Sequence, residues 1–125
     1  MNMTANRILD LVRAAPTAFT FSRPFWEGAR DRKFLLQYCR KTGKPQFYPR
    51  PISLQTGHRD VEWREIPADG TVYTYTIAYR GAEGFRNCEP YLIATVELDA
   101  GVRIIGNVIN CEIDQIAIGM RVKPY

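Results

Sequence analysis

The chain has 125 residues, of which 46% are hydrophobic and 24% charged, so it has the length of one domain or of a small domain with an added module. This composition excludes wholesale disorder, collagen and coiled coil. Seventeen Lys and Arg residues and thirteen Asp and Glu residues are interspersed, and their net charge of +4 favours anionic partners only weakly. Three widely spaced cysteines and the lack of a secretory signal or long apolar run predict a cytoplasmic protein with reduced thiols and no membrane segment.

Helices are expected in the first part of the chain. The segment from Thr4 to Ala15 carries apolar residues at helical spacing and has Thr4 as a candidate N-cap. Ser22 followed by Pro24 is typical of the start of a second short helix, which is expected to end near Arg32. The apolar and aromatic run from Phe34 to Tyr38 predicts the first strand.

The rest of the chain has the pattern of a β protein. Two short strands are expected at Gln46 to Tyr48 and Asp60 to Trp63, and β-branched and aromatic residues after Gly70 predict a longer one. Gly101 suits the positive φ of a hairpin turn, and Gly106 suggests a bulge. Further strands are predicted at Tyr91 to Leu98, Val102 to Asn110 and Met120 to Lys123.

These strands predict a small antiparallel barrel in the second half of the chain, with its last strand missing. A barrel without its closing strand leaves an exposed edge, so the chain is expected to be shortened or to have a partner that covers this edge. The apolar residues Ile113, Ile116 and Ile118 are expected to be incompletely covered for the same reason.

An autonomous catalytic site is hard to assemble from this sequence. The single histidine, His58, lies in a polar turn, and no phosphate-binding loop or zinc-protease motif is present. Cys88 lies near Arg86 and is the thiol whose pKa a neighbouring cation would lower. Cys111 is expected to pack as a small hydrophobic residue at a strand end.

The most informative pattern surrounds Cys39. Zinc ribbons place four thiolates as two Cys-x-x-Cys pairs, each followed by a glycine that lets backbone amides approach the sulfur atoms. The four equivalent positions here are Cys39, Thr42, Ser53 and Thr56, with Gly43 and Gly57 behind the two pairs. Hydroxyl groups do not hold zinc with useful affinity, so the spacing predicts the backbone frame of the ribbon without the metal. Packing of Phe34, Leu36, Phe47, Tyr48 and Trp63 is expected to stabilise it instead.

Together with its flanks, this frame resembles a specific family, the acyl-CoA-associated domain of unknown function family thirty-five. The family combines N-terminal helices, a rubredoxin-like zinc ribbon and a C-terminal OB-fold. The resemblance runs from about Phe19 to Val122, and the sequence departs from the family pattern at three zinc ligands and at the absent final strand. The features that carry the resemblance are Pro24 to Gly28, the strand into Cys39, Tyr48-Pro49-Arg50, Val61-Glu62-Trp63, Gly70 to Thr76, Pro90 to Leu98 and Gly101-Val102-Arg103.

The resemblance implies a mainly β protein with N-terminal helices at 1–33, a degenerate rubredoxin-like zinc ribbon at 34–66 and an OB-fold at 67–125. It also implies a non-catalytic accessory subunit of a thiolase-like acyltransferase, or of an enzyme that forms or cleaves carbon-carbon bonds in acyl-CoA substrates. Such a subunit would work in a hetero-oligomer with the thiolase-like protein, without a cofactor of its own. Any contact with CoA phosphates is expected at basic side chains, with Lys44, Arg50, Arg80 and Arg86 as the candidates.

Two other functions remain open at this point. One is a nucleic-acid-binding OB-fold, in which aromatic side chains stack on bases and arginines contact phosphates. A net charge of +4 with interspersed acids argues against a continuous nucleic-acid track. The other is a stand-alone enzyme. The residues for nucleic-acid binding would be Tyr73, Tyr75, Tyr79 and Phe85 with Arg80, Arg86 and Arg103.

Overall fold

The computed structural model describes residues 5–11 and 14–125, so the predicted N-cap Thr4 and the predicted helical residue Val12 lie outside the described residues. The described chain forms two compact units. We call Pro16–Asp69 with Leu98–Val102 and Lys123–Tyr125 the ribbon unit. The barrel unit holds Gly70–Glu97, Arg103–Val122 and the described residues up to 15. Each unit is considered by itself.

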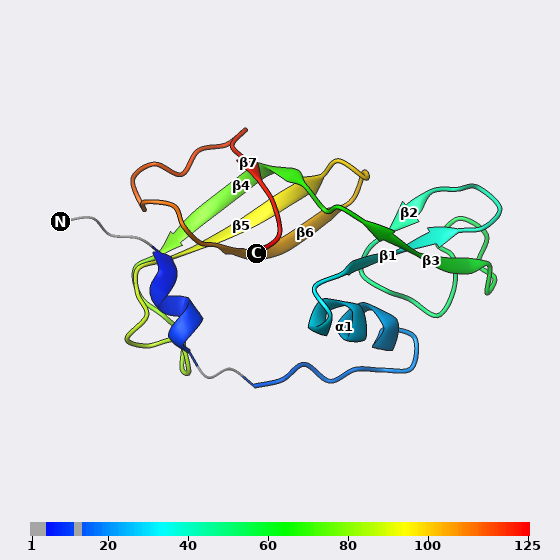
Figure 1. Ribbon diagram of the computed structural model, residues 1–125, viewed down its shortest axis with the longest axis horizontal. Coiled ribbons are helices and arrows are strands. Elements are labelled where there is room, and N and C mark those ends of the chain that lie inside the picture. The colour runs from blue at the N-terminus through cyan, green and yellow to red at the C-terminus, as the bar shows by residue number, and fades with distance from the viewer. Residues whose placement is uncertain (1–4, 12–13) are drawn as a thin grey trace. The chain divides into compact units, whose positions relative to one another are not determined.

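The ribbon unit contains one helix and one sheet (Figure 1). Helix α1 (Arg23–Arg30) is followed by strand β1 (Phe34–Cys39), the short strand β2 (Pro45–Gln46) and strand β3 (Val61–Ile66). The sheet order is β2-β1-β3, and both pairings are antiparallel. The predicted helix and strands of this region are therefore confirmed, although β2 is shorter than expected and β3 continues three residues beyond Trp63.

Aromatic packing joins α1 to the ribbon. The ring of Phe25 lies 5.5 Å from that of Phe34, 5.6 Å from that of Phe47 and 6.3 Å from that of Tyr48. The indole Nε1 of Trp26 donates a hydrogen bond of 3.2 Å to the hydroxyl of Tyr48. Phe34, Phe47 and Tyr48, three of the side chains predicted to stabilise the ribbon, thus all contact Phe25 of the helix. Each such ring pair stabilises the fold by about 0.5–1.5 kcal/mol beyond the contribution of the area it buries.

The barrel unit is a curled four-stranded sheet (Figure 1). Its strands are β4 (Gly70–Ala78), β5 (Tyr91–Leu98), β6 (Arg103–Val108) and the short β7 (Arg121–Val122), in the order β6-β5-β4-β7. The bounds of β5 equal the predicted ones, because alternating β-branched and apolar residues define this strand without help from distant contacts. The turn between β5 and β6 has Gly101 at a φ of 104°, as expected.

Three expectations for this unit are wrong. Gly106 pairs with Ala94 in an unbroken register, so it makes no bulge. Ile113 and Ile116 are only 8% and 6% exposed, because the segment between β6 and β7 turns them inward, while Ile118 is 68% exposed. The helix expected from Thr4 to Ala15 is a shorter 3₁₀ helix, η1 (Ala5–Asp10).

Helix η1 packs against the barrel unit through the side chain of Ile8. Ile8 is 1% exposed and forms a small core with the buried Cys88 and Tyr91. Half-buried side chains of Ile93 and Ile109 pack against this core. Helix η1 therefore covers one end of the sheet face that carries Tyr91 and Ile93, which we call the outer face. None of the helices in the described part of the chain has the length and hydropathy of a membrane span.

Candidate functional site

Two tight turns with the same backbone geometry frame the site predicted around Cys39. In each turn, the first residue donates its N–H to the carbonyl five residues ahead, and a glycine four residues ahead donates back to the first carbonyl. These bonds are 2.8 and 2.8 Å for Cys39 to Lys44 and Gly43 to Cys39, and 2.8 and 2.9 Å for Ser53 to His58 and Gly57 to Ser53. The φ values of 70° for Gly43 and 73° for Gly57 explain why glycine occupies both places. The predicted frame of two knuckles is confirmed.

The centre of this frame is a hydrogen-bonded thiol. Cys39 and Ser53 are both 0% exposed. The hydroxyl of Ser53, and next that of Thr42, hydrogen-bonds the thiol and lowers the pKa of Cys39 from 9.0 to about 7. Ser53 Oγ itself accepts hydrogen bonds from the N–H groups of Gln55 at 3.1 Å and Thr56 at 3.4 Å. The amides that approach sulfur in a zinc ribbon therefore point at a hydroxyl oxygen here.

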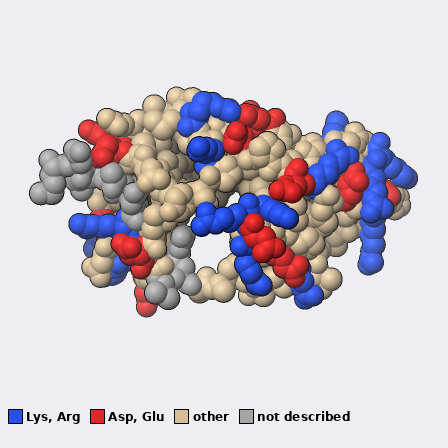
Figure 2. All heavy atoms as spheres, viewed as in Figure 1, with Lys and Arg blue, Asp and Glu red and all other residues tan. Residues whose placement is uncertain are grey.

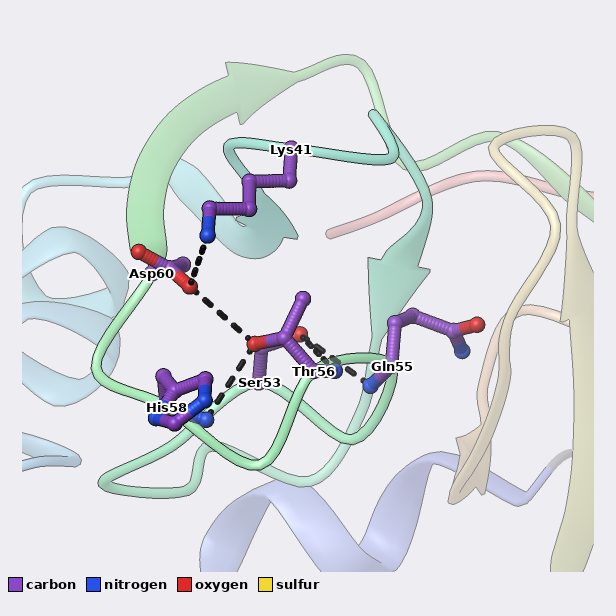
Figure 3. A network of polar contacts seen from close by, with 6 residues as sticks. All are labelled: Lys41, Ser53, Gln55, Thr56, His58 and Asp60. Carbon is purple, nitrogen blue, oxygen red and sulfur yellow. Dashed lines mark hydrogen bonds and ion pairs between the residues drawn. The ribbon is translucent and has the colours of Figure 1, made fainter.

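An acidic residue links the two knuckles (Figure 3). The hydroxyl of Thr56 donates to Asp60 Oδ2 at 3.2 Å and accepts from the N–H of His58 at 3.2 Å. The same Asp60 oxygen lies 3.8 Å from Lys41 Nζ in the first knuckle, and the Asp60 carbonyl accepts from the N–H of Arg40 at 2.8 Å. Polar side chains thus make a connection between the knuckles that a metal makes in a zinc ribbon.

The residues at the four ligand positions do not fit zinc. A structural zinc ion needs about four thiolate or imidazole ligands, whereas this frame offers one thiol and three hydroxyl groups that hydrogen-bond to their neighbours. Within residues 5–11 and 14–125, no group of three or more His, Cys, Asp or Glu side chains is placed to hold a metal ion.

A buried amide network beside the knuckles was missed by the sequence analysis. Gln37 and Gln46 are 2% and 5% exposed, and Gln46 Nε2 donates to Gln37 Oε1 at 2.8 Å. Gln37 also accepts from the N–H of Arg50 at 2.9 Å and donates to its carbonyl at 2.8 Å. Gln46 donates to the carbonyl of Ile52 at 3.0 Å and accepts from the N–H of Leu54 at 2.9 Å. A signal was present, because Gln37 lies two residues before Cys39 on the same face of a strand.

These amides hold the loop before the second knuckle against β1 and β2. The bonds to Arg50, Ile52 and Leu54 all go to backbone groups, so they fix the path of the chain rather than a side chain. A buried polar network of this kind rigidifies a fold when every member is satisfied. Two sets of polar contacts therefore hold the knuckle frame, the Asp60 link and the buried amide pair.

The four predicted CoA contacts are exposed and lie in both units. Lys44 and Arg50 belong to the ribbon unit, where Arg50 has its backbone held by Gln37. Arg80 and Arg86 lie in the barrel unit, in the loop between β4 and β5. In this loop the backbone N–H of Gly81 hydrogen-bonds Glu89 and lowers its pKa, with a smaller contribution from the charge of Arg86. Basic and acidic side chains are both present on the surface seen in Figure 2.

A pocket of about 530 Å³ in the ribbon unit was not expected from the sequence. It lies beside α1 and the end of β3. Its walls combine aromatic rings with cations and with the carboxylates of Glu65 and Asp69. The main aromatic and cationic residues are Phe25, Phe34, Tyr125, Arg32, Lys33 and Lys123.

Burial decides the role of Cys88 and corrects the prediction that this thiol is the one to examine for reactivity. Cys88 is 2% exposed, and its thiol donates to the carbonyl of Phe85 at 2.9 Å, so it is packed in the core around Ile8 and is not a reactive surface thiol. Cys111 is half-buried, and desolvation raises the pKa of its thiol. His58 is exposed, as expected.

The aromatic side chains considered for nucleic-acid stacking are only partly available. Phe85 is half-buried, with its ring 5.8 Å from that of Tyr91. Arg103 lies 3.7 Å over the ring of Tyr73 and donates to Glu97 at 3.0 Å, so its charge is already matched within the sheet. Tyr79 remains 70% exposed.

The fold and the site define a class of protein: a ribbon with two zinc-ribbon-like knuckles that offer one thiol and three hydroxyl groups, followed by a curled sheet of OB type. Comparison with known proteins agrees with this class. The family model of the ChsH2 C-terminal OB-fold domain matches residues 63–125, and that of the ChsH2 rubredoxin-like zinc ribbon domain matches residues 26–52.

Two curated relatives and one solved structure extend this match. A DUF35 domain-containing scaffold protein of Methanocaldococcus jannaschii is 33% identical over 101 residues, which cover 78% of this chain and 71% of the relative. A probable enoyl-CoA hydratase alpha subunit of Thermomonospora curvata is 32% identical over 99 residues, but these cover only 31% of that longer relative. The structure described as Ltp2-ChsH2(DUF35) aldolase superposes with a TM-score of 0.79 and 28% identity over 87% of this chain and 85% of that one. The chain belongs to the DUF35 family.

Proposed function

We propose that this chain is a non-catalytic accessory subunit of an enzyme complex that acts on acyl-CoA. The observation that carries the proposal is the match over most of the chain to the DUF35 part of an aldolase, because that structure is described as two proteins together. The archaeal relative is described as a scaffold protein, and the actinobacterial one as a hydratase subunit. All three descriptions support a role beside an enzyme.

The chemistry of the chain is consistent with this role. Its only histidine, His58, is exposed in the second knuckle. The thiols of Cys39 and Cys88 are buried, so neither is available to attack a thioester. In our proposal the partner is a thiolase-like enzyme, which supplies the nucleophilic thiol and the general base, while this chain stabilises the partner and shapes the entrance to its substrate channel.

Purification of the chain at its native level is expected to bring down a thiolase-like enzyme in a stable hetero-oligomer. The isolated enzyme should be less stable in solution or turn over its acyl-CoA substrate more slowly than the complex, because an interface of this kind covers apolar surface on both partners. Mass measurement of the complex and activity assays with and without the chain test the proposal. A monomer that changes neither the stability nor the rate of the enzyme would show that it is wrong.

Contact with CoA phosphates is proposed for Lys44, Arg50, Arg80 and Arg86, because each is an exposed cation. Replacing all four by glutamine should weaken acyl-CoA binding to the complex by about tenfold or more in calorimetry, since charge-assisted hydrogen bonds contribute about 1.5–3 kcal/mol each. The matched control removes the same charge at four other exposed arginines, Arg7, Arg23, Arg30 and Arg59.

The pocket beside α1 is a competing site for the CoA contact, and the same experiment tests it. A third variant replaces its cations Arg32, Lys33 and Lys123 by glutamine. Unchanged affinity in the first variant together with weaker binding in the third would move the CoA contact from the four proposed residues to the pocket.

A further inference from the structure

Strand β6 is an edge of the sheet, and its alternate residues turn their backbone groups outward. It is the terminal strand of the sheet, and within residues 5–11 and 14–125 only β5 pairs with it. The N–H of Leu98 donates to the carbonyl of Val102 at 2.8 Å, and the following register pairs Val96 with Ile104. In an antiparallel pair, hydrogen-bonded and non-bonded positions alternate. The backbone groups of Arg103 and Ile105 therefore point away from β5, along the open edge.

This edge has only one of the usual protections, the charged Arg103 at the start of the strand. Natural sheets guard exposed edges with charges, proline, bulges or covering segments, because an open edge pairs with other chains. The run from Ile104 to Ile109 contains no charged residue and no proline, and its register with β5 is unbroken through Val108. Ile105 stands in the middle of the strand with 75% of its surface exposed.

The outer face beside the edge is also apolar and open. The contact of Arg103 with the ring of Tyr73 places this tyrosine on the same face as the side chain of Ile105. Tyr73 is 49% exposed, and Tyr75, two residues along β4, is 37% exposed. The other end of this face is covered by η1 through Ile8, so the chain covers one part of the face and leaves the rest uncovered.

The charges on this face lie on both sides of Tyr73. The guanidinium of Arg103 lies 3.0 Å from Glu97 Oε2. Arg121 lies on the same face, where its Nη1 donates to Thr71 Oγ1 at 2.9 Å. At the edge itself, the outward backbone groups of Arg103 and Ile105 require an extended chain as their complement.

We infer that β6 is the docking edge for an extended segment of the partner enzyme, which adds to the sheet as a further strand and lays alternate side chains beside Ile105. The inference rests on the proposed function, because that function supplies the enzyme. The backbone bonds provide affinity, and the exposed side chain of Ile105 favours apolar side chains at the neighbouring positions of the added strand.

The test uses the full chain and the enzyme that is purified with it. Ile105→Lys places a charge on the edge, and Ile105→Pro removes the outward N–H without breaking a bond to β5. Both should weaken binding of the enzyme by about tenfold or more, which corresponds to about 1.4 kcal/mol. Ile118→Lys is the matched control, because this isoleucine is 68% exposed and lies outside the strands; its affinity should stay within about twofold. Thermal melting of each variant reports on folding, and hydrogen exchange should show protection of the amides of Arg103 and Ile105 in the complex.

The outcomes separate this inference from the proposed function. If an enzyme is purified with the chain but binds the two Ile105 variants as tightly as the original, with no protection at β6, the docking edge is wrong and the proposed function stands. If no enzyme is purified with the chain, both are wrong. A dimer of the free chain that Ile105→Lys dissociates, without any effect on enzyme binding, would assign the edge to a second copy and overturn the inference.

Discussion

The triple variant Thr42→Cys, Ser53→Cys, Thr56→Cys is expected to bind one zinc ion per chain, whereas the unaltered chain is expected to contain no stoichiometric zinc. The two knuckles have the same backbone bonds, with glycines at φ values of 70° and 73°. Hydroxyls of Ser53 and Thr42 already reach the thiol of Cys39, so thiols at these places would converge on one point. Because the frame is formed in advance, the variant needs new ligands but no new fold.

The gain in stability should be large. A structural zinc ion contributes on the order of 10 kcal/mol to folding of a small domain. Part of this gain is offset by loss of the bond from Thr56 to Asp60, which is worth about 1 kcal/mol. Metal analysis and thermal melting with and without a chelator measure both effects. A second variant with alanine at the same three positions should take up no metal. If the cysteine variant also takes up none, the two knuckles do not form a tetrahedral ligand set.

Substitution of Gln37 by leucine should destabilise the chain by about 3 kcal/mol or more. The change keeps the size of the side chain, but it leaves the N–H and carbonyl of Arg50 and the Nε2 of Gln46 without bonds of 2.9, 2.8 and 2.8 Å. Each buried polar group that loses its partner costs about 1–3 kcal/mol. Urea denaturation of the isolated chain measures the free energy of unfolding.

The matched control for this change is Gln55→Leu. Gln55 is an exposed glutamine in the second knuckle, and its bond to Ser53 is made by the backbone N–H rather than by the side chain (Figure 3). Its free energy of unfolding should change by no more than about 0.5 kcal/mol. An equal, small change in both variants would mean that the buried amide pair contributes nothing to the stability of the ribbon.

Several features of the fold follow from local sequence alone. Strand β5 has the predicted bounds Tyr91–Leu98, because its alternation and β-branched residues favour one local conformation. The spacing of Cys39, Gly43 and Gly57 predicted two equal turns, and both have the expected backbone. A glycine with positive φ is a local requirement, so it is readable from the sequence.

The amino-acid sequence by itself therefore determined the strands, the knuckle frame and the family pattern, all of which depend on residue spacing and backbone preference. Tertiary structure decided where polar groups find their partners. Whether Gln37 is a solvated or a buried residue depends on Gln46 and Arg50, which come from later turns of the chain. Burial of Ile8 likewise depends on Cys88 and Tyr91, which are distant in sequence. Whether a buried amide finds its hydrogen-bond partners depends on which residues the fold brings next to it, and spacing along one strand does not predict this.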